Sequence, residues 1–367
     1  MSHCCFFCRS AVGGLLVMLL PVGQHVARAQ YQYDPGDFAV TIGEYVEGTG
    51  VGSDYISGDP FDDPYAALGR PTVDTTGDRW NIPLDGPVPV VPVYPAFRSY
   101  EVVSIGLDGQ IILVFDHPVV NEPRNPYGID FVVFGNASQA IAGGAPWTNG
   151  DPNDMIAGPS GLIEPGAVSV SQDGQSWYTF TDSPIPGTDA PSCDVFAPTL
   201  GRVYDPDNPD MSIGQWNEWW GVPTDPTWPL DPRLTWSDFG GQTVADIAQT
   251  YEESAGGTGF DLEWLPEPGL DWIQYVRIVG PSAGGTPELD AVSDVFPRLG
   301  DFDRDDDLDL ADFARFQACF TGPGNVRTLG GCFPADFDGN LVSGDMDVDL
   351  DDYEQFAQYF TGPGTDE

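Results

Sequence analysis

The segment VVSIGLDGQIILVF, residues 102–115, decides the fold class expected for this chain. Apolar residues, many of them β-branched, fill 102–107 and 110–115, and Asp108-Gly109 separates the two runs. An Asp-Gly pair between such runs is typical of a type I′ turn, in which both central residues need positive φ. The segment therefore predicts a β-hairpin.

Working outward, short apolar segments bounded by Gly and Pro fill residues 30–299. Residues 128–135 and 272–279 each predict one strand, and 167–180 predict a second hairpin. Only 244–251 has helical periodicity, preceded by Thr243 with Asp246 three residues later, a weak capping signal. Many short strands between turns predict a mainly β fold, an antiparallel jelly-roll-like sandwich.

The composition restricts the classes of partner. The 367 residues carry 57 Asp+Glu against 13 Lys+Arg, all of them Arg, and a formal net charge of −44. Nucleic-acid binding needs a basic face, so this charge argues against a nucleic-acid partner and against anionic lipid. It favours cations and neutral or positive surfaces.

The N-terminal residues predict an export signal. An apolar run over 11–22 is followed by Ala27-Arg28-Ala29, which suits cleavage after Ala29. Residues 1–29 are therefore expected to be a signal peptide. The run is too short to span a bilayer, so we expect a secreted, extracellular or cell-surface protein without a membrane span after cleavage.

Residues 300–367 differ from the rest of the chain. From 301 onward there are 15 Asp, 2 Glu and 3 Arg, and LDLADFARFQACFTGPG at 308–324 matches VDLDDYEQFAQYFTGPG at 348–364, a shift of 40 residues. This repeat predicts a module of two copies of one unit. The chain is thus expected to comprise a signal at 1–29, a β-sandwich at 30–299 and a duplicated module at 300–367.

Each unit begins with acidic residues spaced as a calcium loop requires. Ca²⁺ prefers six to eight oxygen ligands, which loop positions 1, 3, 5, 7, 9 and 12 can supply, position 7 through its backbone carbonyl. The first loop places these positions at Asp301, Asp303, Asp305, Asp307, Asp309 and Asp312. Leu308, at position 8, is the apolar residue expected to pair the two loops. We therefore expect one calcium ion in the first loop.

The second loop is longer than the first. Positions 1, 3, 5, 9 and 12 fall at Asp336, Asp338, Asn340, Asp349 and Asp352 if 341–345 are inserted. Asp345 and Asp347 are alternatives for the middle ligands. The module is expected to bind two Ca²⁺ ions and to fold poorly without them, because carboxylates crowded in one loop repel each other.

A short amphipathic helix is expected after each loop, in the first unit with Phe313, Phe316, Gln317 and Phe320 on one face. Cys319 and Cys332 both lie in this module, and export permits oxidation, so we predict that they form a disulfide. Cys193 is then left as a buried small hydrophobic residue.

Two Asp-rich loops, each followed by one helix and with no helix before the first, resemble a type I dockerin. In that family each unit binds Ca²⁺ and the module docks onto a cohesin domain of a scaffold or surface protein. By resemblance, the ligand set carries over to the Asp and Asn residues named above. The chain departs at Asp306, where the family usually has Gly. It also departs through the 341–345 insertion, and through Leu310-Ala311 and Leu350-Asp351, where cohesin-recognising dockerins often have Ser-Thr.

In the larger region, VSVSQDGQSWYTF at 168–180 and QYVRIV at 274–279 resemble strands of galactose-binding-like jelly rolls, such as discoidin and carbohydrate-binding modules. The region is also similar to uncharacterised exported cell-surface β-sandwich proteins. Five tryptophans are concentrated in 216–236, either as a platform for sugar rings or as a cover over the sandwich core. They are Trp216, Trp219, Trp220, Trp228 and Trp236.

No catalytic residues emerge. His117 is the only histidine after the signal, so a serine or cysteine nucleophile has almost no choice of base. Glu288, Asp290 and Asp294, with Asp130, either seat a structural ion or are solvated loop acids.

We therefore expect a secreted, non-catalytic β-sandwich protein that a calcium-binding module tethers to a cohesin-like partner, another scaffold protein or a cell surface, in polysaccharide binding or breakdown. One alternative is a polysaccharide-degrading hydrolase or lyase with a dockerin-like tail. The other is a structural cell-envelope protein.

Overall fold

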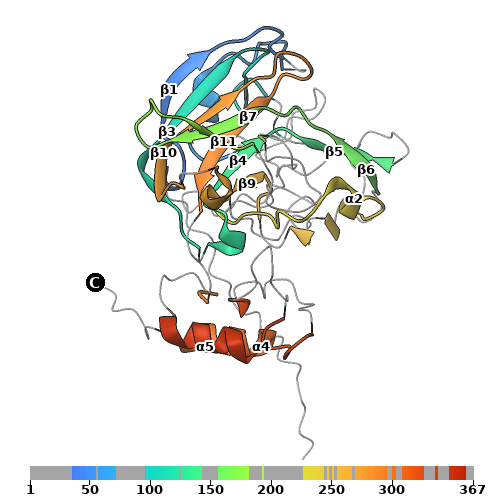
Figure 1. Ribbon diagram of the computed structural model, residues 1–367. Helices are drawn as coiled ribbons and strands as arrows, with labels where there is room; N and C mark the ends of the chain where they lie inside the picture. Colours follow the sequence, from blue (N-terminus) through green and yellow to red (C-terminus); the bar gives the residue numbers. More distant parts are fainter. Residues whose placement is uncertain are drawn as a thin grey trace, which may run out of the picture.

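The computed structural model of the chain describes most of its β-rich part and much of the C-terminal module (Figure 1). The expected signal peptide lies outside the described residues. These are 35–54, 57–71, 96, 98–123, 125–142, 156–181, 192–193, 226–243, 246–247, 250–251, 254–266, 269–295, 300–302, 308–325, 335–337 and 347–360.

Two antiparallel sheets form the main body, which confirms the mainly β prediction. The larger has the strand order β1-β3-β10-β7-β8, and the smaller has the order β2-β11-β4-β9. The strands of the larger sheet are β1 (Thr41–Val46), β3 (Gln110–Val120), β10 (Trp272–Val279), β7 (Ala167–Ser171) and β8 (Tyr178–Thr179). Those of the smaller are β2 (Val103–Ser104), β11 (Glu288–Asp294), β4 (Phe131–Gly135) and β9 (Thr258–Phe260).

Smaller elements surround the two sheets. Strands β5 (Ser138–Ile141) and β6 (Ala157–Leu162) pair beside the short helix α2 (Trp236–Phe239), on the right of Figure 1. The described residues also form the 3₁₀ helices η1 (Pro35–Asp37), η2 (Pro64–Ala67), η3 (Pro126–Gly128) and η5 (Leu262–Trp264). Among the described residues, no helix is long and apolar enough to cross a membrane.

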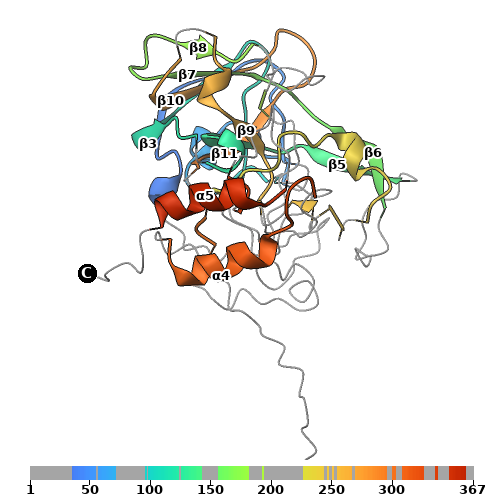
Figure 2. The same cartoon turned by 60° about the horizontal axis from the view of Figure 1, so that its bottom comes forward.

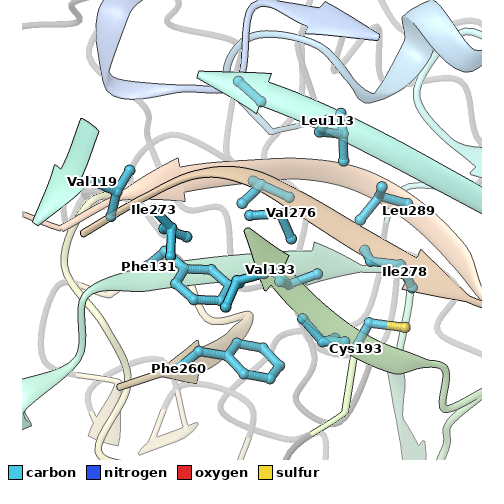
Figure 3. Packing of buried hydrophobic residues seen from close by; sticks show 14 of the residues in the cluster. Leu113, Val119, Phe131, Val133, Cys193, Phe260, Ile273, Val276, Ile278 and Leu289 are labelled. Carbon is cyan, nitrogen blue, oxygen red and sulfur yellow. The ribbon is translucent and has the colours of Figure 1, made fainter. Parts of the chain in front are cut away.

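The main hydrophobic core lies between the two sheets (Figure 3). Alternate residues of β3 and β10, including Leu113, Val276 and Ile278, meet Phe131, Val133 and Leu289 of β4 and β11. This alternation follows from the strand repeat of two, which sends every second side chain to the same face. All these side chains are fully buried. The apolar periodicity of the sequence thus becomes a two-layer core.

The central strand β4 is buried on both faces, which explains its uninterrupted apolar run. Val132 and Phe134 point away from the main core into a second cluster. Trp228 and Ala255 belong to this cluster and come from segments outside the two sheets. The smaller sheet therefore has protein on both sides, as buried strands with continuous apolar sequence usually do.

The hairpin predicted over 102–115 is wrong. Strand β2 pairs with β11, whereas β3 pairs with β1 and β10, so the two apolar runs lie in different sheets. Asp108 has φ 58°, but the positive φ nearby belongs to Gly106, at 72°, and not to Gly109. A type I′ turn needs both central residues at positive φ, so Asp108-Gly109 cannot form one.

The close approach of three chain segments at glycine residues explains why the hairpin does not form. The N–H of Gly48 donates to Ile105 O (2.9 Å), and a Cβ added to Gly106 would lie 2.7 Å from the carbonyl carbon of Gly48. A Cβ on Gly280 would overlap the carbonyl oxygen of Gly106. Three segments can thus approach closely only because these positions lack side chains, and the chain crosses from one sheet to the other there.

The other predicted strands are confirmed. Residues 167–180 form the hairpin of β7 and β8, and 128–135 and 272–279 contain β4 and β10. In the predicted helix, the described Ile247 and Tyr251 donate N–H bonds four residues back, to Thr243 O and Ile247 O, and both are buried. Helix α2 and the 3₁₀ helices were not predicted, because a single turn shows almost no periodicity.

The C-terminal module contains helices α4 (Leu310–Cys319) and α5 (Leu350–Tyr359). Figure 2 shows them lying side by side at one end of the β-rich body. Their contact is aromatic: the Phe316 ring centroid is 5.0 Å from that of Phe356 and 6.2 Å from that of Tyr353. The predicted short helix after each loop is therefore present.

Candidate metal centre

Both module helices begin with the same carboxylate arrangement. Asp309 precedes α4 and accepts the N–H of Ala311 (2.6 Å), and Asp349 precedes α5 and accepts the N–H of Asp351 (2.8 Å). In return, Asp312 and Asp352 each accept the N–H of the aspartate three residues earlier, at 2.8 Å. These reciprocal bonds satisfy helix-end donors and hold four carboxylates at the helix starts.

The two units also close their loops in the same way. The N–H of Phe302 donates to Asp312 Oδ1 at 2.6 Å, and that of Phe337 donates to Asp352 Oδ1 at 2.7 Å. The residues bonded in the first unit are 10 apart in sequence and those in the second are 15 apart. The second loop thus contains five more residues than the first but returns to the same contact. The predicted insertion itself, at 341–345, lies outside the described residues.

One group of carboxylates in the described residues could hold a metal ion. Oxygens of Asp347, Asp349 and Asp352 all lie within 4.8 Å of one another, and Asp347 and Asp352 are buried. Asp347 also accepts the N–H of Gly324, which follows α4. Oxygen-only donors of this kind suit hard cations such as Ca²⁺ or Mg²⁺ better than metals that prefer nitrogen or sulfur.

The described residues include about half of the predicted ligands. Asp301 and Asp336, at the start of each loop, are buried, as are Asp312 and Asp352. Asp347, which was only an alternative for the middle of the second loop, lies in the acidic group. Asp303, Asp305, Asp307, Asp338 and Asn340 lie outside the described residues.

A small core joins the two units. Phe316, Val348 and Phe356 are fully buried in it, with Leu308 partly buried at its edge. The backbone partner of Val348 is Thr321, whose N–H donates to Val348 O at 2.9 Å and whose hydroxyl accepts Val348 N–H at 2.8 Å. The end of α4 therefore supports the second loop. Leu308 and Val348 share one core, as the prediction of paired loops required.

The predicted apolar face of the first helix needs correction. The buried positions are Asp312, Phe316 and Cys319, with Phe313 half-buried. Phe320 is 44% exposed because the helix ends at Cys319 and the next residue has extended ψ. Cys319 is in a disulfide, and the predicted partner, Cys332, lies outside the described residues. Cys193 is a buried thiol in the sandwich core, as predicted.

A second ionisable cluster joins the two sheets. His117 of β3 contacts Asp294 of β11 (Nε2 to Oδ2, 2.8 Å) and Asp116 (Nδ1 to Oδ1, 2.8 Å). The hydrogen bond with Asp294 is the main cause that raises the pKa of His117 to about 9. The two carboxylates favour the charged imidazolium, which has no lone pair to accept a proton.

The acids proposed to seat an ion in the sandwich are used differently. Asp130 accepts N–H bonds from Glu122 (2.9 Å) and Leu262 (2.8 Å) and one from the Asn125 side chain (3.2 Å). Asp294 is bonded to His117. Within the described residues, neither acid belongs to a group able to hold a metal ion, and nor do Glu288 and Asp290. Asp130 and Asp294 therefore connect segments of the fold.

Two of the five predicted tryptophans lie among the described residues. Trp228 is 5% exposed in the cluster behind β4, which leaves almost none of its surface for a sugar ring. Trp236 is half-buried and packs against Gly161 of β6. Both therefore cover apolar surface, and Trp216, Trp219 and Trp220 lie outside the described residues.

Comparison with known proteins adds no family. No protein-family model matches the chain, and no curated protein matches it.

Proposed function

We propose that this chain is an exported, non-catalytic β-sandwich protein whose C-terminal residues 300–367 form a calcium-binding, dockerin-like docking module. Each unit is proposed to bind one Ca²⁺ through its loop, the second with Asp347 among its ligands. The ion offsets the repulsion between the carboxylates, so the module acquires a fixed shape only when calcium is bound.

One observation carries this proposal. The loop-closing bond from Phe302 to Asp312 recurs from Phe337 to Asp352, although five more residues separate the second pair. An acidic tail without a ligand has no reason to return to the same contact across loops of different length. A cage around an ion does, because the carboxylates at both ends of the loop must approach one centre.

The exposed surface of the helices supports a protein partner. Leu310 and Leu350 hold the same position at the start of α4 and α5, and they are 70% and 64% exposed. Large apolar side chains at matching exposed positions are common at protein interfaces. We propose that a cohesin-like domain of a scaffold or surface protein covers them, with leucines in place of hydroxyl residues as the contacts.

For the sandwich, we propose polysaccharide binding that places the protein on its substrate or surface. The two-sheet architecture and the strand resemblances support this role, while the carboxylates beside His117 disfavour the neutral form that a base requires.

The test of the calcium site is titration calorimetry on the full chain. Asp301→Ala combined with Asp312→Ala should reduce the bound Ca²⁺ from two ions to one. The matched control is Asp351→Asn, a charge change at an exposed carboxylate in the other unit, which should keep both ions. Equal stoichiometry for wild type and the double variant would refute the loop assignment.

The test of docking is recovery of a partner. An immobilised wild-type chain should retain a cell-envelope protein in calcium and release it when chelator is added. Leu310→Asp with Leu350→Asp should abolish retention while calcium stoichiometry stays at two. Retention that survives both chelator and the double substitution would contradict calcium-organised docking.

A further inference from the structure

Arg277 has no carboxylate partner among the described residues of this strongly acidic chain. Acidic residues outnumber Lys+Arg 57 to 13, so nearby carboxylates are abundant. Arg98 and Arg233 each form an ion pair with an aspartate, at 2.8 Å. Arg277 forms none with any described residue, and the only cause that lowers its pKa is burial. Its environment therefore differs from those of Arg98 and Arg233.

The strand register explains where Arg277 points. Its neighbours along β10, Val276 and Ile278, are buried in the main core, so alternation sends Arg277 to the outer face of the larger sheet. There it lies between Ile112 of β3 and Ser169 of β7. It is half-buried, so both solvent and a ligand can reach it.

Aromatic and hydroxyl groups surround the guanidinium. Its central carbon lies 4.3 Å from the ring centroid of Trp177, which covers one face of the cation. The hydroxyls of Ser169 and Thr179 are 2.8 Å apart beside it. Tyr275, two residues before Arg277 on the same face, packs under Gly174 of the β7–β8 turn. We call these five residues, Arg277, Trp177, Tyr275, Ser169 and Thr179, the Arg277 platform.

Most N–H donors of the Arg277 guanidinium have no acceptor within the described structure. Of its five N–H donors, one is bonded within the described structure, from Nη2 to Ser169 Oγ at a long 3.4 Å. Its Nε is buried without an acceptor. Burial of a charge without a counter-charge is unfavourable, and an anion paired with the terminal Nη1 and Nη2 donors would offset part of that cost.

We propose that the Arg277 platform binds a hexuronate residue of a short acidic oligosaccharide, with the sugar carboxylate paired to the Nη1–Nη2 edge of Arg277. A planar carboxylate matches the two parallel N–H bonds that a guanidinium offers. The hydroxyls of Ser169 and Thr179 suit the polar edge of a pyranose, and the ring of Trp177 suits its C–H face. This deepens the glycan-binding part of the proposed function and does not depend on calcium-organised docking.

The net charge of −44 determines how the ligand must be probed. A long polyanion would be repelled by the rest of the molecule, so a short oligomer is the appropriate ligand. We therefore choose tetragalacturonate and its methyl ester, which have the same sugar ring but differ in charge. Calorimetry on the full chain should show at least about tenfold tighter binding of the acid, because bonds to a charged group are the stronger ones.

Substitutions test whether Arg277 binds the sugar carboxylate. Arg277→Gln should weaken tetragalacturonate binding at least about tenfold, and Arg277→Lys should also weaken it, because an ammonium lacks the planar edge. Arg315→Gln, in α4, is the matched control with the same charge change and should bind as wild type. Trp177→Phe should remove most of the ligand-induced change in tryptophan fluorescence. That readout and the acid–ester comparison remain decisive if Arg277→Gln does not fold.

Several results would overturn the assignment. These are equal affinity for acid and ester, equal affinity of Arg277→Gln and wild type, or no binding at millimolar ligand. Tetraglutamate binding as tightly as tetragalacturonate would show recognition of a carboxylate peptide and not of a sugar. Binding that disappears with chelator but survives Arg277→Gln would place a calcium bridge elsewhere. Failure of the calcium module leaves all these measurements unchanged, so the two proposals fail separately.

Discussion

Replacing Asp347 with Asn tests whether the acidic group is built for an ion. Its oxygens lie within 4.8 Å of those of Asp349 and Asp352, and three carboxylates at that spacing form three repelling pairs. At an effective dielectric constant of about 20, each pair costs about 3 kcal/mol when no cation is present. The substitution removes the charge from two of the three pairs. It keeps a carbonyl oxygen for the N–H of Gly324.

We expect Asp347→Asn to change the stability of the module in opposite directions with and without calcium. In chelator, Asp347→Asn should stabilise the module, because repulsion falls. In calcium it should destabilise the module, because a charged ligand is lost. Amide hydrogen exchange of the α4 and α5 peptides in the full chain measures both effects. Even half of one pair's repulsion, about 1.5 kcal/mol, changes the exchange rate about tenfold.

Asp351→Asn provides the matched control for this experiment. Asp351 is exposed on the same helix, and its contact with Asp349 uses its backbone N–H, so the variant should behave as wild type in both conditions. Destabilisation of equal size by Asp347→Asn with and without calcium would refute the reasoning. It would mean that Asp347 is only a hydrogen-bond acceptor for the end of α4.

Three further outcomes are expected. The pKa of His117 is raised from 6.5 to about 9, so its ion pair with Asp294 stabilises the fold fully below pH 6.5 and is lost as pH rises through 9. In His117→Gln, the free energy of unfolding measured in urea should therefore depend less on pH between 6.5 and 9. Gly280→Ala should lower unfolding free energy by more than about 2 kcal/mol, whereas Gly269→Ala, in open space, should change it little. Cys319→Ser should make α4 exchange faster in oxidising buffer, and reductant should have no further effect on it.

How far the sequence predicts the fold depends on the range of the interaction. Strands β4, β7 and β10 could be located because their apolar patterns are local and repeat with the strand period. The partner of β2 could not, because the same Asp-Gly pattern serves a hairpin or a crossing between sheets. The approach of Gly48 and Gly280 to Gly106 selects the crossing, and these residues are far apart in the sequence.

The candidate site divides in the same way. The 40-residue repeat predicts two units, and the acid spacing predicts which aspartates begin and end each loop. The place of Asp347 beside Asp349 and Asp352 could not be predicted, because an inserted segment has no fixed path in the sequence. The Arg277 platform could not be assembled from the sequence either. Its residues lie in 168–180 and 274–279, the two segments that resemble jelly-roll strands, but only the pairing of β10 with β7 brings them together.

The sequence by itself determines what is periodic and local: the strand faces, the duplicated acidic loops, the helix caps and the excess of acid. Only the tertiary structure decides which sheet each strand joins, which carboxylates approach one another, and that Arg277 lies on Trp177 without an acidic partner among the described residues. The physical reason is that charge repulsion, ion pairing and close backbone approach depend on distance in space, and chain separation does not specify that distance.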